Sequence, residues 1–229
     1  MNNISIITSV YNSSELLDIF LNHVNNQLED VFEIIFIDAN STDDSLLKIK
    51  NFNFRNGIQV KIIESSTRIS VYEAWNIGIK NSSNNYIVNW NTDDILYPST
   101  LSIYSKYVNR FPEIDVFYGS HVQIKSQNIF DLTDIRIWPE YSHETLLNFC
   151  FCGPFPLVKK QSIEQCGFFN EKYISSSDYD MWLKLSKNNY KFKRIPEFIG
   201  AYFYRQESVS VSNMQKAQQE DKEIQNNYR

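Results

Sequence analysis

The first hundred residues alternate between short apolar runs and longer segments in which apolar residues recur at helical spacing. The short runs are rich in β-branched residues and stop at polar clusters, which is typical of buried strands. The longer segments repeat apolar side chains every three or four positions, as an amphipathic helix does. We therefore predict strands over residues 4–10, 32–37, 60–63 and 86–90, and helices over 16–28, 41–49 and 71–79.

This alternation of strands and helices predicts an α/β fold with a mostly parallel sheet and helices on both of its faces. Ligands of such sheets bind outside the carboxyl ends of the strands. Three polar segments, residues 8–12, 38–40 and 91–94, follow directly on predicted strands. We expect these three segments to converge on one crevice.

The second half of the chain has a less regular pattern. Pro98 opens a helical pattern that runs to Phe111, consistent with proline in a first turn. Residues 129–141 are polar and are expected to be irregular, and residues 212–229 predict a solvated helix or a frayed tail. We expect further helices over 144–149, 162–166 and 178–187, and strands over 115–118, 121–125, 192–195 and 199–204.

Composition and charge exclude several classes of protein. The formal net charge is −5 and the basic residues do not cluster with aromatic ones, which excludes nucleic acid as a partner. The three cysteines, Cys150, Cys152 and Cys166, lack zinc spacing, and their odd number indicates a reducing compartment. No signal peptide and no spanning segment of roughly 20 apolar residues is present, so we expect a cytoplasmic protein, with peripheral association at the inner membrane face left open.

The run Asn91-Thr92-Asp93-Asp94 places two carboxylates at a predicted strand end. Burying adjacent charges is costly unless something compensates for them. A divalent cation does so with oxygen ligands, and it keeps positions open for phosphate oxygens. The alternative is a helix N-cap before Pro98. The position of the pair at the predicted crevice favours the metal site.

Three further features could carry chemistry or local structure. Asp38 ends the second strand, where a carboxylate can accept hydrogen bonds from a base or a ribose. Ser41 with Asp44 resembles a capping box. Asp178 precedes a helix and could serve as a general base, although helix capping is an equal alternative there. For Asp180, two residues on, capping is the favoured interpretation.

Five segments in the right order resemble the family-2 glycosyltransferases, which have the GT-A fold. The resemblance covers roughly residues 4–210. It rests on the opening strand with its Tyr-Asn turn, the second strand with its Ser-Thr-Asp turn, a helix ending in Asn-x-Gly-Ile, the strand before the acidic motif, and an acceptor-side signature. These segments are residues 4–12, 33–45, 72–79, 86–94 and 167–183.

The resemblance implies an inverting, metal-dependent transfer of a hexosyl or N-acetylhexosaminyl group from a nucleoside-diphosphate sugar, with a UDP-sugar favoured. The acceptor would be a hydroxyl of a glycan or lipid-linked molecule in bacterial surface polysaccharide biosynthesis. Asp94 would hold Mn²⁺ or Mg²⁺ against the diphosphate, and Asp178 would deprotonate the acceptor. The residues implied in nucleotide-sugar binding are Thr8, Ser9, Tyr11, Asp38 and Asp93.

The chain departs from the family pattern at four positions. Ala39 and Asn91 stand where acids are frequent, Trp75 where many members carry arginine, and Ser177 where glutamate is common. These departures motivate an alternative, a catalytically inactive nucleotide-sugar-binding relative. A nucleotidyltransferase would need a Gly-rich basic loop after the first strand, and residues 11–15 do not provide one.

The resemblance also divides the chain by function. Residues 1–97 are expected to form the nucleotide-sugar-binding half, and residues 98–211 the acceptor-binding half of the same domain, built on a mixed sheet. Residues 212–229 are expected to form the polar C-terminal helix or tail.

Overall fold

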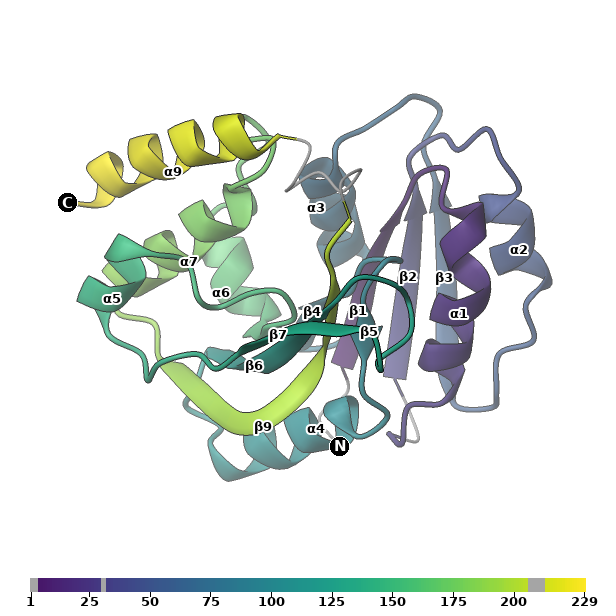
Figure 1. The fold of residues 1–229 in the computed structure, drawn as a ribbon, viewed down its shortest axis with the longest axis horizontal. Coiled ribbons are helices and arrows are strands. Elements are labelled where there is room, and N and C mark those ends of the chain that lie inside the picture. The colour runs from purple at the N-terminus through teal and green to yellow at the C-terminus, as the bar shows by residue number, and fades with distance from the viewer. Residues whose placement is uncertain (1–3, 30–31, 206–212) are drawn as a thin grey trace.

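The computed structural model describes residues 4–29, 32–205 and 213–229. A nine-stranded mixed sheet runs through the molecule, with helices on both faces (Figure 1). Its strands are β1 (Ile4–Val10), β2 (Phe32–Asp38), β3 (Ile58–Glu64), β4 (Tyr86–Asn89), β5 (Ile95–Leu96), β6 (Val116–Ile124), β7 (Leu132–Arg136), β8 (Leu157–Lys159) and β9 (Phe192–Phe203). The helices are α1 (Ser14–Asn25), α2 (Ser45–Asn51), α3 (Val71–Asn81), α4 (Thr100–Arg110), α5 (His143–Asn148), α6 (Lys160–Gln165), α7 (Ser177–Lys187) and α9 (Met214–Tyr228).

The predicted alternation of the first half is confirmed. Strands β3, β2, β1 and β4 lie side by side in that order, and all three pairings are parallel. Successive side chains of a strand point to opposite faces. Ile6 accordingly packs in the cluster that includes the buried side of α1, and Ile7 in the cluster that includes α3. The two helices therefore cover opposite faces, as Figure 1 shows.

Helix α3 approaches the sheet closely at Gly78. A Cβ atom added there would lie 2.4 Å from Ile7 Cγ2 and 2.8 Å from Ile37 Cδ1. Overpacking of this kind costs about 1–3 kcal/mol. We expect Gly78→Ala to lower the free energy of unfolding by that amount in urea denaturation. The exposed neighbour Lys80→Ala serves as control and should change it by less than about 0.5 kcal/mol; equal effects would contradict the close packing of α3.

The second half differs from prediction in how its strands are divided. The pairs of strands expected over 115–125 and 192–204 are each one continuous strand, β6 and β9. These two strands pair in parallel over their length, and the register shifts beside Gly119 and Ser120. The interruption of the apolar pattern therefore marks a bulge rather than a strand end.

Residues 129–141 were predicted to be irregular, yet they contain β7, which pairs antiparallel with β6. All five of its residues are exposed, so neither face leaves an apolar period in the sequence. The unpredicted strands β5 and β8 have two and three residues, and pairing with their neighbours defines them. At the C-terminus the helix is present, and no described helix is both long and apolar enough to cross a bilayer.

The predicted capping box at Ser41 is wrong. Helix α2 begins at Ser45, and the preceding loop is bonded to the loop before α1 instead. Ser41 Oγ accepts the N–H of Asn12 at 3.1 Å, and Asp43 Oδ2 accepts that of Ser14 at 3.0 Å. These contacts pin the two loops that follow β1 and β2 against each other. Pro98 likewise precedes α4 rather than lying in its first turn.

Candidate active site

The three polar segments predicted to converge do so at the carboxyl ends of β1, β2 and β4. Backbone pairing continues past the ends of β2 and β4, because Ala39 N donates to Val10 O at 2.8 Å and Trp90 N to Ile7 O at 3.0 Å. Since neighbouring parallel strands end at one edge of the sheet, the side chains that follow them share that edge.

Four side-chain oxygens at this edge are buried and have no hydrogen-bond partner within the described residues. They are Thr8 Oγ1, Asp38 Oδ1, Asn89 Oδ1 and Asn91 Oδ1. Buried polar atoms in native proteins are nearly always paired, so four unpaired ones at a single edge require an explanation. The hydrogen-bond donors of a bound ligand, or a bound cation, would satisfy these oxygens.

Asp38 and Tyr11 are held by specific contacts. Asp38 Oδ2 accepts the N–H of Ser41 at 3.1 Å, which orients the carboxylate and leaves Oδ1 unpaired. The Tyr11 ring is 41% exposed, and the guanidinium of Arg68 lies 3.5 Å from its centroid. Ser9 is half-buried on β1 between these segments. The sequence did not predict Arg68 as a site residue. Only its position in the loop after the third predicted strand could have indicated it.

Asp94 is fixed by contacts on both sides. Its N–H donates to Asn91 O at 3.2 Å, and its Oδ1 accepts the N–H of Phe203, at the end of β9, at 3.2 Å. The side chain is 4% exposed. Burial and then the neighbouring Asp93 carboxylate raise the pKa of Asp94 well above its usual value. Burial also raises the pKa of Asp93, and the Arg205 charge opposes that rise.

The alternative reading of Asp93 and Asp94 as a helix cap is wrong. Helix α4 begins at Thr100 with Ser99 at its N-cap, and strand β5 separates the acidic pair from it. The neighbouring carboxylates of Asp93 and Asp94 supply the oxygen ligands that a hard divalent cation prefers. Nowhere in residues 4–29, 32–205 and 213–229 do three His, Cys, Asp or Glu side chains form a ligand group. A cation at Asp94 would therefore draw its other ligands largely from phosphate oxygens and water, which is usual for Mg²⁺.

Asp178 lies in the first turn of α7 and is partly exposed. Its Oδ1 accepts the N–H of Tyr179 at 2.9 Å, and the buried phenol of Tyr72 lies close to its carboxylate. Tyr72 belongs to the first turn of α3, which starts on the crevice side of the sheet. Desolvation, supported by the Asp221 charge, raises the pKa of Asp178 to about 6. The carboxylate thus has the pKa of an effective base near neutral pH.

Asp180 does not cap α7, contrary to prediction, because the N-cap residue is Ser176. Its Oδ1 accepts the hydroxyl of Tyr228 at 2.9 Å, and its Oδ2 lies 3.3 Å from Lys184 Nζ. Asp180 therefore joins α7 to the C-terminal helix.

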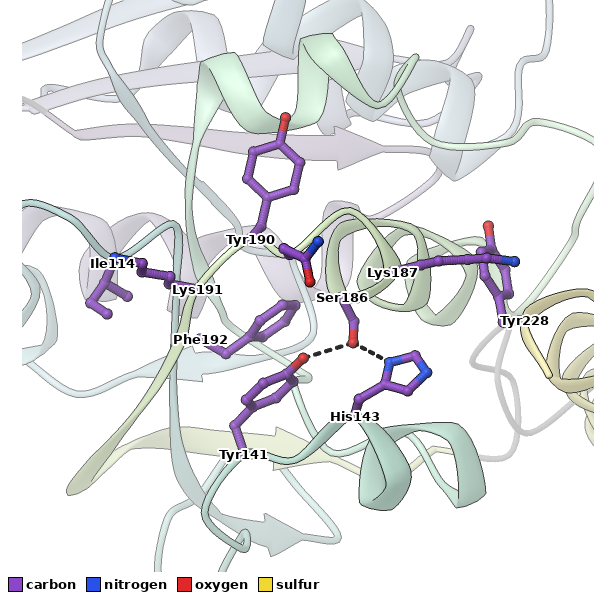
Figure 2. A pocket seen from close by; sticks show the side chains of 10 residues that line it. Ile114, Tyr141, His143, Ser186, Lys187, Tyr190, Lys191, Phe192 and Tyr228 are labelled. Carbon is purple, nitrogen blue, oxygen red and sulfur yellow. Dashed lines mark hydrogen bonds between the residues drawn. The ribbon is translucent and has the colours of Figure 1, made fainter.

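A cavity of about 660 Å³ lies at the other end of α7 (Figure 2). There Tyr141 and His143 point toward Ser186, whose Oγ lies 2.7 Å from the Tyr141 hydroxyl and 2.5 Å from His143 Nδ1. None of the predicted site residues lines this cavity. These three hydrogen-bonded side chains connect α5 and the residues before it to α7. We therefore place the candidate site at the strand ends.

Comparison with known proteins decides the family. Residues 5–165, more than half of the chain, match glycosyl transferase family 2. The chain belongs to this family.

Curated relatives of this family-2 protein include bacterial polysaccharide enzymes. It is 25% identical over 211 residues to the chondroitin synthase of Escherichia coli, matching 92% of this chain and 30% of that protein. It is 25% identical over 208 residues to the amylovoran biosynthesis glycosyltransferase AmsB of Erwinia amylovora, matching 86% and 68%. The chain thus spans less than a third of the chondroitin synthase.

Solved structures share the fold of this family-2 protein. TarS residues 1–349 of S. aureus, in complex with UDP-GlcNAc, align with a TM-score of 0.76 and 18% identity over 92% of this chain and 61% of that one. The mannosyltransferase PcManGT of Pyrobaculum calidifontis, in complex with GDP-Man and Mn²⁺, aligns with a TM-score of 0.73 and 15% identity over 94% and 61%. The predicted GT-A fold is confirmed.

Proposed function

We propose that this family-2 protein is an inverting glycosyltransferase that moves a sugar from a nucleoside-diphosphate sugar to a hydroxyl of a glycan or lipid-linked acceptor. The observation that carries the proposal is the set of four buried, unpaired oxygens at the strand ends, the edge of the sheet that Asp93 and Asp94 follow. The relatives named for chondroitin and amylovoran support a role in surface polysaccharide biosynthesis. The complex of TarS with UDP-GlcNAc favours a UDP-sugar.

In this proposal residues 1–97 bind the donor and residues 98–211 the acceptor. Thr8, Ser9 and Tyr11 lie along the nucleotide. The unpaired Oδ1 of Asp38 accepts a hydrogen bond from the base or ribose, while its Oδ2 stays bonded to Ser41. Asp93 faces the ribose side.

Asp94 would hold the divalent cation, Mn²⁺ or Mg²⁺, which when bound stabilises the negative charge that develops on the diphosphate. The hydrogen bond from Phe203 fixes one carboxylate oxygen and so orients the other. Because the carboxylate is preoriented, little reorganisation is needed when the charge develops.

Asp178 would act on the acceptor. Its carboxylate takes the proton of the acceptor hydroxyl as that oxygen forms a bond to the anomeric carbon. The bond from the anomeric carbon to the diphosphate breaks, and the diphosphate leaves with the electron pair. A single displacement of this kind inverts the anomeric configuration. The N–H of Tyr179 orients the base.

The test is a thermal-shift series with UDP, GDP, TDP and CDP, each with and without Mn²⁺. A ligand bound only by the folded state at 100 times its Kd adds about 2.7 kcal/mol, which for a chain of this size raises Tm by about 5 to 10 °C. We expect that rise with UDP and Mn²⁺, with uridine as the control that lacks the diphosphate. No response to any of the four nucleotides would overturn the proposal.

An inactive donor-binding relative, which Ala39 and Asn91 motivate, would give the same thermal shift. Transfer of sugar by the purified protein to an added glycan distinguishes the two functions. Binding without donor hydrolysis or transfer would favour the inactive relative.

A further inference from the structure

Glu220, on the C-terminal helix α9, is a buried carboxylate with three backbone donors. Its Oε1 accepts the N–H of Ile174 at 2.9 Å, and its Oε2 accepts those of Ser175 at 2.9 Å and Ser176 at 3.1 Å. The residue is 6% exposed. Three consecutive amides directed at one charged acceptor form a strong and geometrically specific contact.

These three amides belong to the turn that leads directly into α7. The helix begins at Ser177, Asp178 is its second residue, and the side chain of its N-cap residue, Ser176, makes no capping hydrogen bond. The turn that sets the direction of the first helical residues is therefore held by a carboxylate 44 residues or more further along the chain. A negative charge near a helix N-terminus is also favoured by the helix dipole.

Other residues of α9 also contact the first turn of α7. Residues four apart lie on one helix face, so Glu220, Ile224 and Tyr228 form a stripe. Ile224 is buried in the core, and the Tyr228 hydroxyl donates to Asp180 at 2.9 Å. Gln225 Nε2 lies 3.3 Å from the hydroxyl of Tyr179. Figure 1 shows α9 lying alongside α7.

The titratable groups that face Asp178 come from three elements. They are Tyr72 on α3, Cys150 and Cys152 on the segment after α5, and Asp221 on α9. Burial keeps the cysteines neutral by raising their pKa values. Asp221, on α9, therefore supplies the negative charge beside Asp178.

We propose that Glu220 is a positioning residue for Asp178: by binding the three amides of residues 174–176, it fixes the start of α7 and so aims the Asp178 carboxylate at the acceptor hydroxyl. This inference rests on the proposed role of Asp178 as the base. A distant mutation that displaces a catalytic group by about 1 Å can lower a rate by about 100-fold.

The test compares Glu220→Gln with Glu223→Gln. Glutamine keeps the shape of Glu220 but has one acceptor oxygen, and its NH₂ group faces backbone donors. We expect kcat to fall about 10- to 100-fold with the donor KM unchanged, because the donor lies on other elements. Glu223 is the matched control, since it contacts Lys172 Nζ at 2.6 Å in the same loop but none of the three amides. Its replacement should leave kcat within about twofold.

Two further readouts separate positioning from loss of folding. A displaced Asp178 is better solvated, so the acid limb of the kcat profile should move below pH 6 in Glu220→Gln. Glu220→Asp keeps the charge and should recover part of the lost kcat. Wild-type kcat in Glu220→Gln, or an equal loss in Glu223→Gln, would overturn the inference. If Asp178→Asn itself transfers sugar at the wild-type rate, the proposed base is wrong instead.

Discussion

Asp178→Asn is expected to lower kcat by about 100- to 10,000-fold and to leave donor binding intact, because general base catalysis contributes a factor of that size. The asparagine side chain has the same shape and keeps an oxygen for the Tyr179 N–H, but it cannot take up the acceptor proton. The measurement is the transfer rate at saturating donor and acceptor, with the thermal shift by UDP and Mn²⁺ recorded on the same protein.

The role of Asp178 as the base also predicts how the activity of the wild-type enzyme changes with pH. The base must be ionised, and desolvation raises the pKa of Asp178 to about 6. Activity should therefore rise with pH through about 6, whereas an ordinary aspartate would give an acid limb near pH 4. Asp180→Asn is the control: Asp180 lies two residues after Asp178, and asparagine keeps an oxygen for the Tyr228 hydroxyl, so the start of α7 stays held and the variant should keep most of kcat. A wild-type rate in Asp178→Asn would remove Asp178 from the mechanism.

Asp94→Ala should remove the Mn²⁺-dependent part of the rise in Tm with UDP, a loss of about 5 to 10 °C under saturating conditions. The reason is that the proposed cation ligand is gone, and the uncompensated diphosphate charge remains beside Asp93. The measurement is the thermal shift with UDP across a Mn²⁺ titration.

Asp94→Asn separates metal binding from folding. It keeps an acceptor for the N–H of Phe203 but removes the charge. Burial and Asp93 hold the pKa of Asp94 above its unfolded value, so ionisation of Asp94 destabilises the fold as pH rises above that unfolded value. Without metal, Asp94→Asn should therefore melt at or above the wild-type temperature near pH 7, while showing no Mn²⁺-dependent shift. A full shift in this variant would exclude Asp94 as the ligand.

The parallel half of the fold was predictable because its signals are local. Residues 4–10 and 32–37 are apolar runs bounded by polar turns, and the helices between them have a regular period. In the second half the helices were predicted close to their observed positions, but the strand limits were not, because they depend on pairing partners. Strand β7 is exposed on every residue, and β5 exists through its pairing with β9. A bulge beside Gly119 looks like a strand end when only the pattern is read.

Within the candidate site, sequence alone determined which side chains share an edge of the sheet. Alternating strands and helices force parallel pairing, and parallel strands carry the residues after their ends to one place, so Asp38 and Asp94 were predictable members. Tertiary structure alone decided what holds them there. The amide of Phe203 that orients Asp94, the Arg68 guanidinium over Tyr11 and the Glu220 carboxylate under the Asp178 turn are contacts between distant segments. Such contacts leave no local period in the chain, since each depends on how separate elements pack.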